Sequence, residues 1–205
     1  MSGDRAHWDE VYRNRPIQGA SWYRPHLDVS LALLRQAGLD TAARVIDIGA
    51  GASTLVDDLL GLGLRDVTVL DLSDTALAAS RERLGPHAAS VRWLAADVLQ
   101  TEFPPAAFDL WHDRAVLHFL ATLEDAARYV AQAARAVRPG GHAVIGGFAP
   151  EGPPRCSGLP VTRRSAAELA ALFAPAFRLL DQRSEQHLTP AGTTQAFTYV
   201  LLARA

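Results

Sequence analysis

The sequence predicts an α/β fold, in which helices cover both faces of a mostly parallel β-sheet. One observation behind this prediction is that apolar runs of strand length alternate with stretches of helical period along most of the 205 residues. Another is a pair of strand-like runs, 177–186 and 195–203, joined by a turn near Pro190. Such a pair predicts a hairpin at the sheet edge with at least one antiparallel strand. No segment repeats and no linker interrupts the chain, so one domain is expected.

The predicted elements follow one another in a regular order. Buried strands are expected at 44–48, 66–70, 91–95, 108–113 and 142–148. Helices are expected at about 27–37, 55–60, 74–84, 123–137 and 166–173. Ser73 or Asp74 is expected to cap the third of these helices, and Pro139 with the two glycines after it to stop the fourth. The segment 149–160 is rich in Pro and Gly and is predicted to be a surface loop.

Composition excludes several classes of protein. The chain has 20 basic and 22 acidic side chains, a formal charge of −2 and no basic cluster, so nucleic acid is not an expected partner. No apolar run approaches the ~20 residues of a membrane-spanning helix, so no membrane partner is expected either. Every basic residue is arginine, which excludes a catalytic lysine nucleophile and Schiff-base chemistry.

The cysteine and histidine content bears on metals and on the cellular compartment. Cys156 is the only cysteine, and the seven histidines show no zinc-binding spacing, so no metal is expected. A lone cysteine forms no internal disulfide, and the polar start of the chain lacks the apolar core of a signal peptide. We therefore expect a reducing, cytoplasmic setting. Nothing in the sequence decides between a monomer and a homodimer.

Acidic residues lie at the tips of three successive predicted strands. Asp47 is followed by a Gly-Ala-Gly turn, Asp71 ends the next strand, and Asp97 follows the third. In a parallel sheet these tips share the edge where ligands bind. An acid at the first tip would repel a pyrophosphate, whereas the second could accept hydrogen bonds from a ribose diol. Each acid could instead cap a helix or a turn, but three at successive tips favour a binding site.

The third acid could accept a hydrogen bond from the amino group of an adenine. Two apolar residues next to these acids, Leu72 and Val98, could hold the ring between them. A dinucleotide is disfavoured, because Thr54 stands where a third glycine would be expected and because of the first acid. An NAD-dependent oxidoreductase and a non-catalytic binding module are therefore the weaker alternatives.

Four motifs add to this pattern: Val-Ile-Asp-Ile-Gly-Ala-Gly from residue 45, Val-Leu-Asp-Leu-Ser from 69, Ala-Ala-Asp-Val from 95 and Val-Arg-Pro-Gly-Gly from 137. Together they resemble the successive motifs of class I S-adenosylmethionine-dependent methyltransferases, over about 44–203. The resemblance implies a Rossmann-like seven-stranded sheet with an antiparallel last strand, and S-adenosylmethionine as the cofactor. Ser53 departs from the pattern, since many members have a glycine there.

The resemblance, together with the aromatic residues before residue 44, gives the set expected at the cofactor. In this family the amino group of the cofactor or a water often lies near the first acid. The expected cofactor-binding residues are Asp47, Gly49, Gly51, Ser53, Asp71, Leu72, Asp97, Val98 and Trp22.

The tip of the fourth strand carries the expected catalytic residues, His112, Asp113 and Arg114. The histidine or the aspartate could accept a proton, and the arginine could orient an acidic substrate. The alternative is that Asp113 and Arg114 pair with each other while His118 packs under the loop.

Substrate contacts are expected from the flanking segments. Residues 1–43 are predicted to form a lid or cap ahead of a cofactor-binding domain at 44–205, and their aromatic pattern faintly resembles thiopurine and other thiol methyltransferases. The alternative is that these aromatic residues only fix the segment to the sheet. The candidate substrate residues are Trp8, Tyr23, His26, His118, Cys156 and His187.

These observations predict methyl transfer by direct displacement to a small-molecule acceptor: a thiol, amine, hydroxyl or metalloid. The alternative is a protein lysine methyltransferase, because the Ser-Trp-Tyr at 21–23 and the aspartate after the fourth strand loosely resemble enzymes that modify translation factors.

Overall fold

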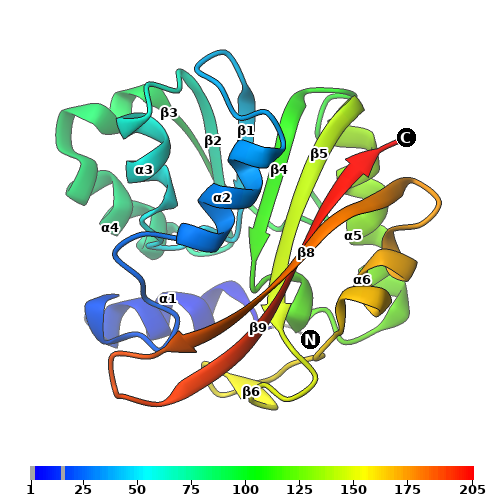
Figure 1. The fold of residues 1–205 in the computed structure, drawn as a ribbon. Helices are drawn as coiled ribbons and strands as arrows, with labels where there is room; N and C mark the ends of the chain where they lie inside the picture. Colours follow the sequence, from blue (N-terminus) through cyan, green and yellow to red (C-terminus); the bar gives the residue numbers. More distant parts are fainter. Residues whose placement is uncertain (1–2, 15–16) are drawn as a thin grey trace.

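The computed structural model describes residues 3–14 and 17–205 and shows a seven-stranded sheet with helices on both faces (Figure 1). Its strands are β1 Arg44–Ile48, β2 Asp66–Asp71, β3 Val91–Ala95, β4 Phe108–Arg114, β5 Val137–Phe148, β8 Phe177–Leu188 and β9 Thr194–Arg204. Across the sheet their order is β3-β2-β1-β4-β5-β9-β8, and β9 runs antiparallel to both neighbours. The predicted mostly parallel sheet and its closing hairpin are confirmed, with the antiparallel strand one position inside the edge.

Two apolar layers hold helices against the two faces of the sheet. The helices are α1 Arg5–Asn14, α2 Asp28–Gln36, α3 Leu55–Gly61, α4 Asp74–Leu84, α5 Leu123–Ala136 and α6 Ala166–Phe173. One core cluster joins α2 and α3 to the sheet, and the other joins α5 and α6 to its opposite face. None of the helices in the described part of the chain is both long and apolar enough to cross a membrane.

Alternation along each strand decides which side chains reach which face. In β1, Val45 belongs to the cluster under α2 and α3, whereas Ile46 and Ile48 belong to the cluster under α5. Successive side chains of a strand point to opposite faces, so Asp47 shares the α2 face with Val45. The same rule applies to the tip of β4, where the site residues lie.

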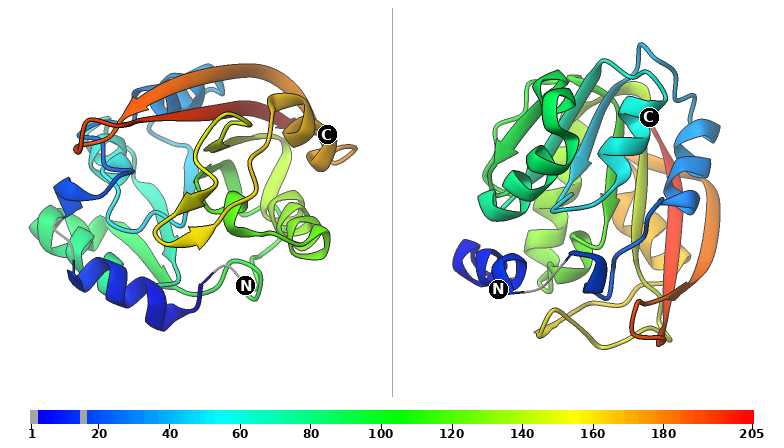
Figure 2. Two further views of the ribbon diagram at one scale, coloured as in Figure 1. Left: turned by 90° about the horizontal axis from the view of Figure 1, so that it is seen from below. Right: turned by 90° about the vertical axis from the view of Figure 1, so that its left-hand side faces the viewer.

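The carboxyl ends of the parallel strands meet at one edge of the sheet, which several other segments cover. Helix α1, the short hairpin of β6 Arg155–Cys156 and β7 Leu159–Pro160, and the turn between β8 and β9 all lie at this edge (Figures 1 and 2). Helix α1 packs against the start of α4, where Asp9 accepts hydrogen bonds from the hydroxyl of Ser73 and the amide of Thr75. The N-terminal segment is therefore attached to the sheet edge where the strands end.

Two segments differ from the sequence prediction. The predicted surface loop 149–160 contains the β6–β7 hairpin. The Pro-Gly-Gly at 139–141 lies inside β5 rather than before it, because β5 already pairs with Phe108 at Val137 and pairs again at His142. The intervening residues form an irregularity in which Gly140 has a positive φ of 72°. Glycine adopts this conformation without the strain that a side chain would add.

Helix α6 begins with a capping box that offers a test of local stability. The hydroxyl of Ser165 accepts a hydrogen bond from the amide of Glu168, and the Glu168 carboxylate accepts one from the amide of Ser165. The substitution Ser165→Ala should lower the free energy of unfolding by about 1 kcal/mol in denaturant titrations. Ser184→Ala, on the exposed side of β8, is the matched control and should change it by less than about 0.5 kcal/mol. Equal effects of the two substitutions would contradict the role given to the cap.

Candidate active site

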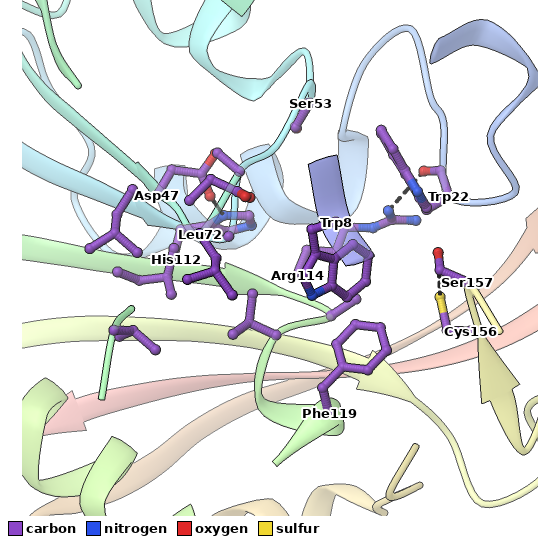
Figure 3. Close-up of a pocket in the computed structure, with 18 of the residues that line it drawn as sticks. Trp8, Trp22, Asp47, Ser53, Leu72, His112, Arg114, Phe119, Cys156 and Ser157 are labelled. Carbon is purple, nitrogen blue, oxygen red and sulfur yellow. Dashed lines mark hydrogen bonds and ion pairs between the residues drawn. The ribbon is translucent and has the colours of Figure 1, made fainter. Parts of the chain in front are cut away.

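A pocket opens at the carboxyl ends of the strands, beside the point where the strand order reverses between β1 and β4. Its lining comes from the tips of β1, β2 and β4, from the segments after β3 and β5, and from the N-terminal segment. Figure 3 shows two ends: Asp47, Leu72 and His112 lie at one, and Arg114, Trp22 and Cys156 lie at the other. The aromatic lining residues are Trp8, Tyr12, Trp22, Tyr23, Phe119, Phe148 and Phe197.

Asp71 ties two loops together at the first end of the pocket. Its buried carboxylate accepts hydrogen bonds from the amides of Gly51 and Ser73, both at 2.8 Å. Burial raises the pKa of Asp71 to about 6, although the two amide hydrogen bonds oppose this shift. The loop after β1 and the loop after β2 are thereby held in one arrangement against the pocket.

The turn after β1 needs glycine at two positions. Gly49 and Gly51 have φ values of +60° and +53°. A Cβ atom on Gly49 would lie 1.9 Å from the side chain of Val116, and one on Gly51 would lie 2.0 Å from the hydroxyl of Tyr12. The turn is therefore in direct contact with the loop after β4 and with α1.

The segment after β3 completes this end. Val98 is buried and, together with Leu72, lines the pocket. Asp97 also lines it, but its carboxylate accepts hydrogen bonds from the amide of Leu99 at 2.8 Å and from the side chain of Gln100 at 3.1 Å. Ser53 also lines the pocket, close to the start of α3. The structure therefore brings together the residues that the sequence placed at successive strand tips.

Asp47 and His112 form a buried polar pair on the α2 face of the sheet. The Asp47 carboxylate lies 2.7 Å from Nδ1 of His112, and Nε2 of the same ring lies 2.8 Å from the hydroxyl of Ser30 on α2. Both ring nitrogens are thus engaged, so this imidazole holds β1, β4 and α2 together. The second oxygen of Asp47 is buried and has no hydrogen-bond partner among the described residues.

Asp113 points away from the pocket, because it alternates with its two neighbours along β4. Its buried carboxylate accepts hydrogen bonds from the hydroxyl of Tyr129 at 2.6 Å and from the amides of Val116 and Leu117 at 2.8 and 3.0 Å. Burial raises the pKa of Asp113 to about 6. These contacts shape the turn after β4, and they differ from the Asp113–Arg114 pair considered from the sequence.

Arg114 lines the second end of the pocket. Its Nε donates to the hydroxyl of Tyr199 at 2.9 Å, and its Nη1 donates to the carbonyl of Trp22 at 3.0 Å. The guanidinium also lies over the ring of Phe197, with its central carbon 4.5 Å from the ring centre. These contacts fix the plane of the guanidinium.

The six candidate substrate residues occupy three kinds of position. Trp8, Tyr23 and Cys156 line the pocket. His26 lies outside it, with a side chain 65% exposed and 2.7 Å from Asp58, whose hydrogen bond and charge raise the pKa of the histidine. The other two, His118 and His187, are buried outside the lining set.

The two buried histidines differ in their contacts. The Nε2 atom of His187 lies 2.7 Å from the carbonyl of Ser21 and donates to it, whereas neither ring nitrogen of His118 has a hydrogen-bond partner in the described part of the chain. His118 is instead packed against the rings of Phe119 and Phe148. Burial, with the charges of Arg114 and Arg164, lowers its pKa to about 3.

Several lining residues were not singled out from the sequence. Tyr12 follows Trp8 by four residues, so a helical reading of this segment would have placed both on one side of α1. Phe148 ends β5, at the same sheet edge as the other strand tips. Phe197 lies on β9, and no local pattern relates that strand to the pocket.

Comparison with known proteins shows what this chain is similar to. Residues 46–145, which contain the turn after β1, the tips of β2 to β4 and most of β5, match the model of the methyltransferase domain family. This stretch is a little under half of the chain, and over it the chain is similar to methyltransferase domains.

The proteins that this chain resembles carry names with different substrates. The chain is 26% identical over 145 residues to the eEF1A lysine and N-terminal methyltransferase of Mus musculus, a match that covers 68% of this chain and 20% of that protein. The 1,6-didemethyltoxoflavin-N1-methyltransferase of Burkholderia thailandensis has 24% identity and a TM-score of 0.77, over 98% of this chain and 87% of that one. The N-methyltransferase NodS of Bradyrhizobium japonicum has 16% identity and a TM-score of 0.75, over 98% and 97%. The two solved structures share the fold.

His118 offers a test of the geometry described for the buried histidines. Because its folded pKa of about 3 lies below the usual 6.5, the unfolded chain takes up the proton first as the pH falls, and stability is lost between pH 6.5 and 3. Replacing His118 by Phe breaks no hydrogen bond between described residues. It also removes the titrating group that causes this loss of stability. Between pH 7 and pH 5, the His118→Phe protein should lose about 2 kcal/mol less unfolding free energy than the native protein.

The matched control for this measurement is His87→Phe, at an exposed position after α4. It should keep the native dependence of stability on pH. If His118→Phe and His87→Phe show the same dependence in denaturant titrations at the two pH values, the assignment of a neutral, buried His118 is wrong.

Proposed function

We propose that the protein transfers a methyl group from S-adenosylmethionine to a small-molecule acceptor. The observation that carries this proposal is the division of one pocket into two ends. One end has acidic side chains and Gly49, and the other is lined by aromatic rings and Arg114. Arg24 lines the same pocket, whereas Gly51 lies outside the lining set. Acceptors of four kinds fit the proposal: thiols, amines, hydroxyls and metalloids.

The residues of the first end suit the cofactor. The second oxygen of Asp47 is a buried acceptor that lacks a donor within the described residues, as an amino group would supply. Asp71 would accept hydrogen bonds from the ribose, and Leu72 and Val98 would contact the adenine from the pocket wall. When bound, S-adenosylmethionine supplies a methyl group on a positively charged sulfur. Ser53 would complete the cofactor contacts, whereas Trp22, which the sequence placed at the cofactor, lies at the end with Arg114.

The segment 1–43 supports the proposal as a lid. Trp8 packs edge-to-face on Phe119 with ring centres 5.0 Å apart, and Tyr12 touches the glycine turn, so α1 contacts both ends of the pocket. A lid of this kind would exclude water from the reacting groups. Direct displacement depends on alignment of acceptor, methyl and sulfur more than on a strong base.

The roles of the three proposed catalytic residues differ under this geometry. Arg114 would contact the acceptor, because it lines the second end of the pocket. His112 and Asp113 would act as positioning residues: the first joins β4 to β1 and α2, and the second shapes the turn that follows β4. Acceptors that arrive as anions need no proton removal and suit such a site.

Cofactor binding can be tested by calorimetry with S-adenosylhomocysteine. The native protein should bind it with a dissociation constant of about micromolar order, equivalent to roughly −8 kcal/mol. Asp71→Asn should weaken binding at least about tenfold, because an amide cannot accept from the two loop amides and a ribose in the same way. The control Asp66→Asn lies at the exposed start of the same strand and should bind as the native protein does. Absence of binding by the folded native protein would rule out the proposed function.

A protein lysine methyltransferase is the second candidate, favoured by the relatives that modify eEF1A. The chain spans about a fifth of the length of the first of these and less than half of the second. A lysine ammonium must lose a proton before it accepts a methyl group, as a protonated small amine must. The acids near the pocket are engaged by amides or by His112, apart from one oxygen of Asp47, which counts against ammonium acceptors of both kinds.

Radiolabelled S-adenosylmethionine distinguishes the two candidates. Incubation with a cell extract separated into small molecules and proteins should place the label in the small-molecule fraction. Label in a discrete protein band that is absent with the Asp71→Asn protein would favour the protein substrate instead.

A further inference from the structure

The second end of the pocket carries a positive charge without a negative partner. Of the nitrogens of Arg114, Nε and Nη1 are engaged, whereas Nη2 is buried and has no hydrogen-bond partner among residues 3–14 and 17–205. A buried guanidinium nitrogen without an acceptor is costly, so an acceptor from a ligand would satisfy it. The contacts of the other two nitrogens hold this one in a fixed direction.

Nearby acids do not neutralise this charge. Within the described residues, no carboxylate forms an ion pair with Arg114. Glu185 reaches it only through Tyr199, whose hydroxyl donates to Glu185 at 2.7 Å while accepting from Arg114. Glu185 also lies 3.8 Å from Arg24, with which it shares its charge.

The buried thiol and the two buried histidines near Arg114 are neutral near pH 7. Burial raises the pKa of the Cys156 thiol, and burial and the charge of Arg114 lower the pKa values of His118 and His187. Arg24 also lines the pocket, but it pairs with Asp28 at 3.2 Å and lies 3.8 Å from Glu185, whereas Arg114 forms no ion pair within the described residues. The Arg114 guanidinium therefore carries its charge among largely aromatic side chains, where charge attraction is stronger than in water.

The surfaces around Arg114 are flat and apolar. Phe197 lies beneath the guanidinium, and Phe119, Phe148 and Trp8 line the same pocket. Aromatic rings favour flat ligands, which stack on their faces or contact their edges. The site thus combines aromatic walls with one buried cationic nitrogen that lacks an acceptor within the described residues.

We infer that the acceptor is a small, flat compound with one anionic group, and that this group binds the Nη2 atom of Arg114. The inference rests on the proposed methyl transfer and names the substrate class of the same pocket. An uncharged or cationic acceptor of the same shape would leave the positive charge of the Arg114 guanidinium without a counter-charge. A carboxylate or thiolate on an aromatic ring has the required chemistry.

Benzoate and benzamide test this inference, because they match in shape and differ in charge. Binding of each is measured by calorimetry to the protein saturated with S-adenosylhomocysteine. Benzoate should bind at least about tenfold more tightly than benzamide, and high salt should reduce this preference. In Arg114→Gln the preference should disappear. In the control Arg155→Gln, which removes an exposed arginine from β6 next to Cys156, the preference should remain.

The outcomes separate this inference from the proposed function. If S-adenosylhomocysteine binds but the native protein takes benzamide as tightly as benzoate, the inference is overturned and the cofactor site stands. Retention of the preference in an Arg114→Gln protein that still binds S-adenosylhomocysteine would also overturn it. If the Arg114→Gln protein does not fold, Arg114→Lys replaces it in the test. Because lysine keeps the positive charge, both the native protein and Arg114→Lys should bind benzoate more tightly than benzamide. Failure of the native protein to bind S-adenosylhomocysteine would remove both proposals.

Discussion

The carboxylate of Asp71 is the interaction on which the rest of the pocket depends. It accepts amide hydrogen bonds from Gly51 and from Ser73, so one buried side chain fixes the loops after β1 and β2. Ser73 also caps α4, and its hydroxyl donates to Asp9 on α1. The glycine turn, the start of α4 and the covering helix therefore share one point of attachment. The burial that raises the pKa of Asp71 to about 6 is the cost of this arrangement.

Much of the fold and of the cofactor end could be predicted from local sequence, because the acids at 47, 71 and 97 stand at strand tips and parallel strands bring such tips together. At the tip of β4, a position at the end of a strand is not enough to place a side chain in the pocket. His112 and Arg114 line the pocket, but Asp113 between them faces α5 and accepts from Tyr129. The two-residue period of a strand separates neighbours, and this rule is available from the sequence.

Other parts of the site could not be predicted because their contacts join distant segments. His26 follows closely in the sequence on residues that line the pocket, but its side chain is exposed beside Asp58 on α3. Conversely, Phe197 and Tyr199 lie more than eighty residues from Arg114 and yet surround its guanidinium, since β9 pairs with β5. The position of a late strand within a sheet follows from packing and topology rather than from local propensity.

The placement of β9 between β5 and β8 has a consequence for how the pocket is assembled. The tips of β1 to β4 line the proposed cofactor end, whereas the wall around Arg114 uses side chains of β9. A substitution that disturbs β9 would therefore act first on the proposed acceptor end and leave the strand tips at the other end in place. The two ends of the pocket can thus change independently, although they belong to one sheet.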